Sequence, residues 1–579
     1  MSAVNGSAAA SAAASEAGSA VASAEPLVEV KDLVIDFPTA SGTVRAVDGL
    51  TFRLEAGGAL GIVGESGSGK SATAYALLDL HRGTGAKTGG TVRVAGTDVL
   101  GADDSVLRRL RGGQAAMVFQ DPLSSLDPYY AIGDQIAEVY RVHVKATRRA
   151  ARERAVQVLD RVGIPDAARR SRARPHEFSG GMRQRALIAM ALACEPRLLI
   201  ADEPTTALDV TVQAQILDLL HELRAETGMG LLLVTHDLGV VAGSVDDVLV
   251  MRNGSAVERG PVSAVLDAPR EPYTRALLAA VPQVDGARTV TIVKPREAPD
   301  EAADVVAEAP LLEAVGLRRE FGGRRDTVTA VDGVSLTVRR GETLGIVGES
   351  GSGKTTLGRM LVRLLDPTAG ELRYGGRDIG SLSDKALRPL RRELQMVFQD
   401  PVSSLNPRRS IGESIADPLR AAGELSDKAV IERVRELLER VGLEPDWYHR
   451  YPHEFSGGQR QRVGIARALA PSPKLIVCDE PVSALDVTTQ AQVVALLGEL
   501  QRDLGLSLVF IAHDLAVVRQ VSDRVAVMRA GLIVEEGPAD TVYDSPQHAY
   551  TKGLLAAVPV LDPVESSARR ASRKRLAAV

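Results

Sequence analysis

The sequence predicts an α/β protein in which one domain occurs twice. Three observations support this prediction. The phosphate-loop-like sequence GESGSGKS at 64–71 recurs as GESGSGKT at 348–355. Matched segments containing VFQDP, PHEFSGG and DEP then follow in the same order after each copy. Short apolar segments such as LGIVGES and LIVCDEP are rich in β-branched residues, which is typical of buried parallel strands.

Composition limits the class of protein. The chain has 579 residues, of which 45% are hydrophobic and 25% charged, as is usual for a soluble globular protein. Its net charge of -5 argues against a protein that mainly coats nucleic acid. Two cysteines cannot form a disulfide framework, so we expect Cys194 and Cys478 to be buried thiols in a reducing compartment. The sequence has no uninterrupted apolar run of 18 residues, so we expect no membrane span.

Changes in composition suggest five segments. An Ala/Ser-rich start has neither the basic residues nor the apolar centre of a secretion signal, so we expect disorder there. A stretch rich in Pro, Glu and Asp reads as a linker, and the Arg-rich end reads as a tail. The expected segments are a disordered leader (1–25), a first domain (26–284), a linker (285–309), a second domain (310–560) and a basic disordered tail (561–579).

Each copy begins with a loop of the pattern G-x-x-x-x-G-K-[ST]. Its glycines let backbone N–H groups turn toward a β-phosphate, and the positive end of the next helix faces the same anion. We expect Lys70 and Lys354 to reach the β- and γ-phosphates, and Ser71 and Thr355 to hold Mg²⁺. The expected nucleotide-binding residues of the two loops are Gly64, Glu65, Ser66, Gly67, Ser68, Gly69, Lys70, Ser71, Gly348, Glu349, Ser350, Gly351, Ser352, Gly353, Lys354 and Thr355.

A later strand in each copy ends in two carboxylates. LLIADE ends in Asp202 and Glu203, and LIVCDE ends in Asp479 and Glu480. Ligands collect at the carboxyl ends of parallel strands, and neighbouring strand residues face opposite ways. We therefore expect each Asp to serve Mg²⁺ and each Glu to polarise the attacking water.

A second anion site is expected where a serine and two glycines open a helix in each copy. The hydroxyl and the unobstructed N–H groups suit a phosphate. One domain hardly needs two phosphate cradles for one nucleotide, but two domains facing head to tail would complete each other's sites. A phosphate-loop kinase or GTPase would leave this motif unexplained. The residues concerned are Ser179, Gly180, Gly181, Ser456, Gly457 and Gly458.

Taken together, these motifs make the chain resemble an ATP-binding-cassette (ABC) ATPase with two fused cassettes. More narrowly, it resembles the ATP-binding subunits of bacterial oligopeptide/dipeptide importers. The subfamily marks are FQDPxSSLxP and the closing segments EPYTRALLAAVP (271–282) and HAYTKGLLAAVP (548–559). The resemblance implies two P-loop NTPase domains. Each would have a RecA-like parallel-sheet core, an antiparallel β subdomain and a helical subdomain.

The resemblance also implies roles for further matching positions. His236 and His513 match the switch histidine that acts on the γ-phosphate. Phe37 and Phe321 match the aromatic that stacks on adenine, although packing alone would also explain them. The resemblance assigns Mg²⁺ contacts to Ser71, Gln120, Asp202, Thr355, Gln399 and Asp479.

The resemblance implies an ATPase at the cytoplasmic face of a bacterial membrane. Its partners would be two transmembrane permease subunits and an extracellular solute-binding protein, with no nucleic acid. The alternative is a twin-cassette ATPase without membrane partners, of the translation or DNA-repair type. Those proteins carry long charged arms or zinc modules, which this sequence lacks. No cysteine follows Cys478, so the iron–sulfur segment of some peptide importers is not expected.

Two finer expectations concern coupling and symmetry. We expect the membrane partner to dock around Gln120–Tyr130 and Gln399–Arg409, and we expect Leu126 and Leu405 to take part. The family's signature usually ends in glutamine, but the first copy has Met182. We therefore expect a mild inequality between two active sites. The transported solute, which could be an oligopeptide, a dipeptide, glutathione or a nickel complex, is not evident from the sequence.

Overall fold

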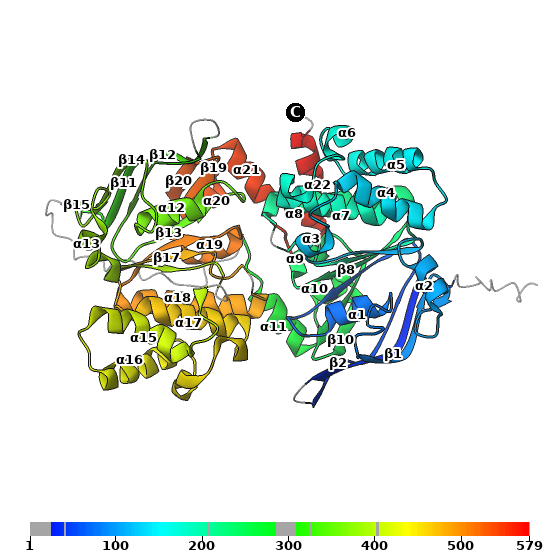
Figure 1. The fold of residues 1–579 in the computed structure, drawn as a ribbon, viewed down its shortest axis with the longest axis horizontal. Coiled ribbons are helices and arrows are strands. Elements are labelled where there is room, and N and C mark those ends of the chain that lie inside the picture. Colours follow the sequence, from blue (N-terminus) through cyan, green and yellow to red (C-terminus); the bar gives the residue numbers. More distant parts are fainter. Residues whose placement is uncertain are drawn as a thin grey trace, which may run out of the picture.

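The computed structural model shows two similar α/β domains side by side (Figure 1). It describes residues 25–39, 42–206, 208–284, 309–322, 327–400, 404–483 and 485–577. Nearly all of the expected leader and linker lies outside these ranges, so those two predictions stay untested. Among the described residues, no helix combines the length and the apolar character needed to cross a membrane.

The first domain contains two sheets. An antiparallel sheet has the strand order β2-β1-β4-β5, and a six-stranded sheet has the order β10-β9-β3-β8-β7-β6. The strands are β1 (Val28–Thr39), β2 (Gly42–Leu54), β3 (Ala59–Val63), β4 (Lys87–Val94), β5 (Thr97–Asp98), β6 (Ala115–Val118), β7 (Leu198–Asp202), β8 (Gly230–Thr235), β9 (Asp247–Arg252) and β10 (Ser255–Pro261). The helices are α1 (Lys70–Ala76), α2 (Asp104–Leu110), α3 (Pro122–Ser125), α4 (Ile132–His143), α5 (Arg148–Arg161), α6 (Ala167–Arg170), α7 (Gly180–Leu192), α8 (Val210–Thr227), α9 (Leu238–Ala242), α10 (Val262–Asp267) and α11 (Pro272–Ala280).

The second domain repeats this plan. Its sheets have the orders β12-β11-β14-β15 and β16-β17-β18-β13-β19-β20. The strands are β11 (Leu312–Phe321), β12 (Val328–Val338), β13 (Thr343–Val347), β14 (Ala369–Tyr374), β15 (Arg377–Asp378), β16 (Leu394–Val397), β17 (Leu475–Asp479), β18 (Ser507–Ile511), β19 (Arg524–Arg529) and β20 (Leu532–Pro538). The helices are α12 (Lys354–Leu361), α13 (Asp384–Leu387), α15 (Ile411–Ala422), α16 (Asp427–Arg440), α17 (Gly457–Leu469), α18 (Val487–Leu504), α19 (Leu515–Val521), α20 (Ala539–Asp544), α21 (Ala549–Ala556) and α22 (Pro563–Ala577).

The larger sheet of each domain forms because its strands are apolar on both faces. Every residue of β3, β7 and β8 is buried, as is every residue of β13, β17 and β18. These strands pair in parallel, whereas β10 and β20 add antiparallel edges. Two-sided burial is the usual condition of parallel strands, so the predicted α/β architecture is confirmed.

A helical subdomain follows the parallel strand β6 in the first domain and β16 in the second. In the first domain α4 and α5 pack on each other and on α7, and α15, α16 and α17 repeat this arrangement. Thr147 caps α5 and Ser426 caps α16, each accepting a backbone N–H three residues later. The helices therefore form a layer beside the sheet, attached to it through α7 and α17.

The two domains exchange their closing segments. Helix α11 of the first domain packs on α18 of the second, and α21 of the second packs on α8 of the first. Val284, the last described residue before the linker, is buried in the apolar core of the second domain. The domains are therefore joined by packed helices as well as by the chain itself.

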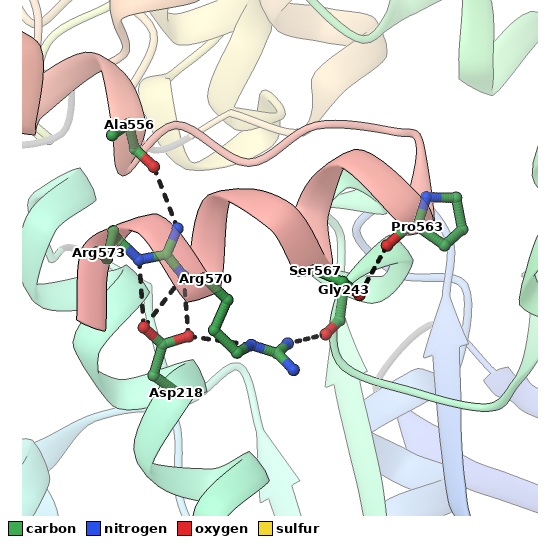
Figure 2. A network of polar contacts seen from close by, with 7 residues as sticks. All are labelled: Asp218, Gly243, Ala556, Pro563, Ser567, Arg570 and Arg573. Atoms are coloured by element: carbon green, nitrogen blue, oxygen red, sulfur yellow. Dashed lines mark hydrogen bonds and ion pairs between the residues drawn. The ribbon is translucent and has the colours of Figure 1, made fainter. Parts of the chain in front are cut away.

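The expectation of a disordered tail was wrong. Residues Pro563–Ala577 form the helix α22, which lies against the first domain. Asp562 starts this helix by accepting the backbone N–H groups of Val564 and Glu565. The arginines that suggested a solvated tail bind a carboxylate of the first domain, as Figure 2 shows. A sequence pattern of charged residues cannot reveal such a distant partner.

Candidate nucleotide-binding sites

Each phosphate loop joins a buried strand to a helix. The loop glycines Gly69 and Gly353 adopt φ values of 97° and 101°, which favour glycine, and they cap the helices α1 and α12. A Cβ atom on either would collide with a backbone carbonyl of the antiparallel sheet, that of Ala46 or Ala330. Glycine is required at both positions for this close approach.

The loop lysines are buried inside their own loops. Lys70 Nζ donates to the carbonyl oxygens of Gly64 at 2.8 Å and Glu65 at 2.9 Å, and Lys354 makes the same two bonds. Burial lowers the pKa of both lysines, although nearby carboxylates, first among them Glu203 and Glu480, act against this. A bound phosphate would add negative charge beside these ammonium groups and so favour their charged form.

Two loop hydroxyls have no hydrogen-bond partner. Ser68 Oγ and Ser352 Oγ are buried and unpaired among the residues that the structure describes. An unpaired buried hydroxyl is unfavourable, by about 1–3 kcal/mol. Because the same atom is unpaired in both loops, the shared cause is a loop shaped for a further acceptor, and phosphate oxygens fit that place.

The expected metal-binding pairs do lie together. Ser71 Oγ donates to Asp202 Oδ1 at 3.0 Å, and Thr355 Oγ1 donates to Asp479 Oδ1 at 2.9 Å. Burial raises the pKa of Asp202 to about 6 and also raises the pKa of Asp479. The other oxygen of Asp202, Oδ2, is buried without a partner in the described part of the chain. A hydroxyl and a carboxylate with a spare oxygen form a donor set that Mg²⁺ accepts.

The carboxylate that follows β7 collects three polar side chains. Gln120 Nε2 donates to Glu203 Oε2 at 2.8 Å, Thr206 Oγ1 donates to the same oxygen at 2.8 Å, and His236 Nδ1 lies 3.3 Å from Oε1. Burial acts to raise the pKa of Glu203, but its bond to His236 is the main cause that brings it below the ordinary value. The same contact raises the pKa of His236 against the effect of burial.

The second domain repeats this cluster. Gln399 Nε2 donates to Glu480 Oε2 at 2.7 Å, and His513 Nδ1 lies 3.6 Å from the same oxygen. Both Glu203 and Glu480 have φ values of 45°, a left-handed conformation that strains a residue with a Cβ. Neither residue is in an extended conformation, so the alternation of strand residues does not by itself determine where its carboxylate lies.

The signature serines begin long helices. Ser179 caps α7 and Ser456 caps α17 by accepting a backbone N–H at 3.3 Å. A Cβ on Gly181 would collide with Val212, and one on Gly458 would collide with Thr489. The second glycine of each signature is therefore needed because the helix that follows the Asp-Glu strand packs directly against it.

Residue 182 makes the two signatures different. Gln459 Oε1 accepts the backbone N–H of Ser456 at 3.0 Å, which completes a capping box at the start of α17. Met182 cannot accept this bond, and its side chain packs against the apolar core of the first domain. The sequence suggested a lost contact to nucleotide, whereas the structure shows a lost contact within the helix start.

Two threonines connect the domains reciprocally. Thr488 Oγ1 lies 2.8 Å from Glu65 Oε1 of the opposite phosphate loop, and Thr211 Oγ1 lies 2.7 Å from Glu349 Oε1. Within its own domain, Thr488 Oγ1 also lies 2.7 Å from Asp486, and Thr211 Oγ1 lies 2.7 Å from Asp209. The sequence analysis missed both threonines, although their repeated position after ALDV was a usable signal.

A closing-segment tyrosine meets one phosphate loop. The backbone N–H of Glu349 donates to Tyr550 Oη at 3.1 Å, and Arg529 lies over the Tyr550 ring at 4.9 Å. In the first domain Arg252 lies over Tyr273 at 4.7 Å, and the backbone N–H of Glu65 acts against the burial that raises the pKa of the Tyr273 hydroxyl. Sequence reasoning used these tyrosines only as family marks.

The two candidate adenine aromatics occupy different surroundings. Phe37 packs edge-on against His81 at 5.3 Å between ring centres, whereas Phe321 is 41% exposed beneath Arg319. Leu126 and Leu405, expected at the docking surface, are instead buried in the helical subdomains. Both leucines belong to the apolar cores of their domains, together with residues of α4 and α15.

The family models match both domains. The ABC transporter model matches residues 47–206 and 331–483, and the model of the oligopeptide/dipeptide transporter C-terminal region matches 257–306 and 534–578. A solved post-hydrolysis dimer of the ATP-binding cassette MJ0796 with ADP and phosphate is 31% identical. That match covers 39% of this chain and 98% of that chain, with a TM-score of 0.37.

Curated relatives match the chain over nearly its whole length. The glutathione import ATP-binding protein GsiA of Escherichia coli (strain K12) is 48% identical over 572 residues, which cover 94% of this chain and 91% of the relative. The protein of the same name from Salmonella typhimurium (strain LT2) is 48% identical over 570 residues, with the same coverage. The chain belongs to the ABC transporter family, as an ATP-binding protein with two cassettes that carry the oligopeptide/dipeptide transporter C-terminal region.

Proposed function

We propose that the chain hydrolyses ATP at two composite sites and thereby drives an importer of small peptides. The observation that carries this proposal is the reciprocal pairing of Thr488 with Glu65 and of Thr211 with Glu349. Each phosphate loop touches the segment that follows the Asp-Glu strand of the other cassette. The signature serines begin helices packed beside those same segments. ATP would therefore be bound by a phosphate loop on one side and a signature on the other.

The residues divide the work of hydrolysis. The phosphate loops and Lys70 or Lys354 would hold the β- and γ-phosphates, and the opposite signatures would cover the γ-phosphate. Mg²⁺, held by Ser71 and Asp202 or by their counterparts, would neutralise charge on the transferred group. Glu203 and Glu480, kept ionised at neutral pH, would accept a proton from the attacking water.

The histidines and glutamines would hold these carboxylates in place. His236 and Gln120 both bond Glu203, so the carboxylate has little freedom to rotate before ATP arrives. His513 and Gln399 do the same for Glu480. Arrival of a γ-phosphate beside His236 would compete for that ring, because both the phosphate and the carboxylate attract its proton.

Membrane partners would dock on the helical subdomains. The loop after Gln120 carries two exposed aromatics, Tyr129 (81%) and Tyr130 (62%), and Gln120 itself lines a cavity together with Phe119 and Val139. The chain would act as a peripheral protein at the cytoplasmic face of the membrane, with two permease subunits and an external solute-binding protein. The twin-cassette alternative without membrane partners is disfavoured by the oligopeptide/dipeptide C-terminal region.

The relatives narrow the solute. They are named for glutathione import, and glutathione is a small peptide-like anion. We therefore propose glutathione or a short peptide as the transported solute. Uptake of labelled glutathione and of labelled dipeptides into cells that lack and then regain the gene would test this choice. Uptake of neither would reject it.

Two experiments test the ATPase proposal. In Glu203→Gln/Glu480→Gln, ATP should still bind while turnover falls at least about 100-fold, the low end for loss of a general base. Normal turnover would remove both carboxylates from the mechanism. In the second, cysteines placed near Ser68 and near Ser456 should crosslink within one chain, and more strongly with ATP. A crosslink that forms only between chains would reject the composite sites.

A further inference from the structure

The C-terminal helix of the second cassette binds the first cassette through a group of charged hydrogen bonds (Figure 2). Arg573 Nη2 lies 2.8 Å from Asp218 Oδ1 and 3.0 Å from Oδ2, and its Nε lies 3.1 Å from Oδ2. Arg570 Nε donates to Asp218 Oδ1 at 3.2 Å, and its Nη2 donates to the carbonyl oxygen of Gly243. Asp218 lies on α8 and Gly243 follows α9, so two arginines of one cassette hold two elements of the other.

The contact is closely packed rather than loosely solvated. The side chains of Asp218, Arg570 and Arg573 are 17%, 13% and 23% exposed. A Cβ on Gly243 would collide with Ser566 of α22, and a Cβ on Gly239 would lie 3.0 Å from Pro559. Exposed ion pairs contribute little because water and salt screen them. The bonds among Asp218, Arg570 and Arg573 are largely shielded from water, so we expect them to stabilise the contact more than exposed ion pairs would.

Within the described part of the chain, the contact occurs on one side only. Helices α8 and α18 are equivalent, and the position of Asp218 in α8 corresponds to Ala495 in α18. The position of Gly243 corresponds to Gln520. The second cassette therefore has neither the carboxylate nor the glycine that would receive such a helix. By contrast, the contacts between α11 and α18 and between α21 and α8 occur on both sides.

No member of this contact belongs to a nucleotide site. Asp218 lies in the third turn of α8, beyond the Thr211 that meets the opposite phosphate loop. Arg573 also donates to the carbonyl oxygen of Ala556 at 3.1 Å, which ties α22 to α21 of its own cassette. The bonds can therefore remain when ATP and the bonds between Thr and Glu are lost.

We propose that the surface around Asp218 and Gly243 is a docking site for α22 of the same chain. By this contact the two cassettes remain paired while no nucleotide is bound. The helix is joined covalently to the second cassette, so docking restrains their separation without needing ATP. The second cassette has no equivalent surface, so the restraint acts only at the edge of the interface where α22 lies. The cassettes would therefore separate first at the opposite edge.

The test compares two variants of equal charge change on the same helix. Arg573→Ala removes the bonds to Asp218. Arg569→Ala is the control, because Arg569 bonds Glu565 and the carbonyl oxygens of Leu555 and Val558 within the second cassette. Fluorescent donor and acceptor dyes on cysteines at the exposed Glu153 of α5 and Lys428 of α16, in a chain whose native cysteines are replaced by alanine, report the distance between cassettes.

Without nucleotide, Arg573→Ala and Asp218→Ala should broaden and lengthen the distance distribution, while Arg569→Ala should leave it as in the parent chain. Saturating ATP should restore one short distance in all of them. The ATP concentration at which half of the chains are closed should rise about tenfold in Arg573→Ala and in Asp218→Ala, as expected for loss of hydrogen bonds between charged groups. Identical nucleotide-free distributions in Arg573→Ala and Arg569→Ala would overturn the proposal.

Two further measurements keep the result specific. Asp218→Glu, which keeps the carboxylate, should retain the narrow distribution and Asp218→Asn should broaden it, a distinction that a variant merely disturbing α8 would not show. Ala495→Asp should change nothing, because none of the helices that the structure describes places arginines at that position. Energy transfer between chains that carry the donor alone and chains that carry the acceptor alone would show α22 docking on a second copy, and this would also overturn the proposal.

Discussion

Replacement of Met182 by glutamine tests how the two signatures differ. Gln459 gives the N–H of Ser456 an acceptor at 3.0 Å, whereas the equivalent N–H of Ser179 has no such glutamine. Met182→Gln therefore adds one neutral hydrogen bond, worth about 0.5–1.5 kcal/mol. That energy corresponds to a slowing of amide exchange at Ser179 of roughly twofold to twelvefold.

The assay is hydrogen–deuterium exchange read at the start of α7 and of α17 in the same sample. Gln459→Met is the matched control, and it should speed exchange at Ser456 by a similar factor. In a Lys70→Ala background, which leaves only the Lys354 site, Met182→Gln should also lower the ATP concentration for half-maximal turnover, by no more than that factor. Unchanged exchange at Ser179, or an equal gain in Lys354→Ala chains, would refute the reasoning.

Three more predictions concern individual bonds. Thr488→Val should leave the fold intact but raise the ATP concentration for half-maximal turnover severalfold, because Glu65 loses a hydroxyl worth about one hydrogen bond. Tyr550→Phe should weaken ATP binding at its own site by up to about tenfold, because Glu349 loses the hydroxyl that accepts its backbone N–H; unchanged binding would contradict this. The bond between His236 and Glu203 stabilises the protein most below the ordinary histidine pKa of 6.5, and that contribution is lost as pH rises through the raised pKa. The melting temperature of His236→Gln should therefore fall less than that of the parent chain as the pH rises above about 6.5.

Local sequence rules predicted the parts of the fold that depend on neighbouring residues. The buried strands β3 and β7 were predicted correctly because each is short and apolar on both faces. The phosphate loops read correctly because glycine at Gly69 and Gly353 has a steric cause that a pattern captures. The duplication followed from the matched motifs.

The errors and omissions arose where a residue depends on a distant one. Arg573 looked like part of a solvated tail because its partner, Asp218, lies 355 residues away in sequence. The left-handed conformation of Glu203 depends on the turn between β7 and the segment that follows it, and no residue type there demands it. Leu126 looked like a docking residue because the turn-rich sequence around it hides its burial.

The differences between the cassettes bear on whether both sites can work. The lysines, the Asp-Glu pairs, the histidines and the signature Ser-Gly-Gly are present in both copies and make matching bonds. The difference at Met182 amounts to one hydrogen bond at the start of a signature helix. One such bond changes affinity by about tenfold at most, whereas loss of a general base reduces turnover by about 100-fold or more. A site that keeps its carboxylate but loses one hydrogen bond should still hydrolyse ATP. If each site acts alone, Lys70→Ala and Lys354→Ala chains should therefore each retain partial ATPase activity. Complete loss of ATPase activity in both variants would instead show that neither site hydrolyses ATP without the other.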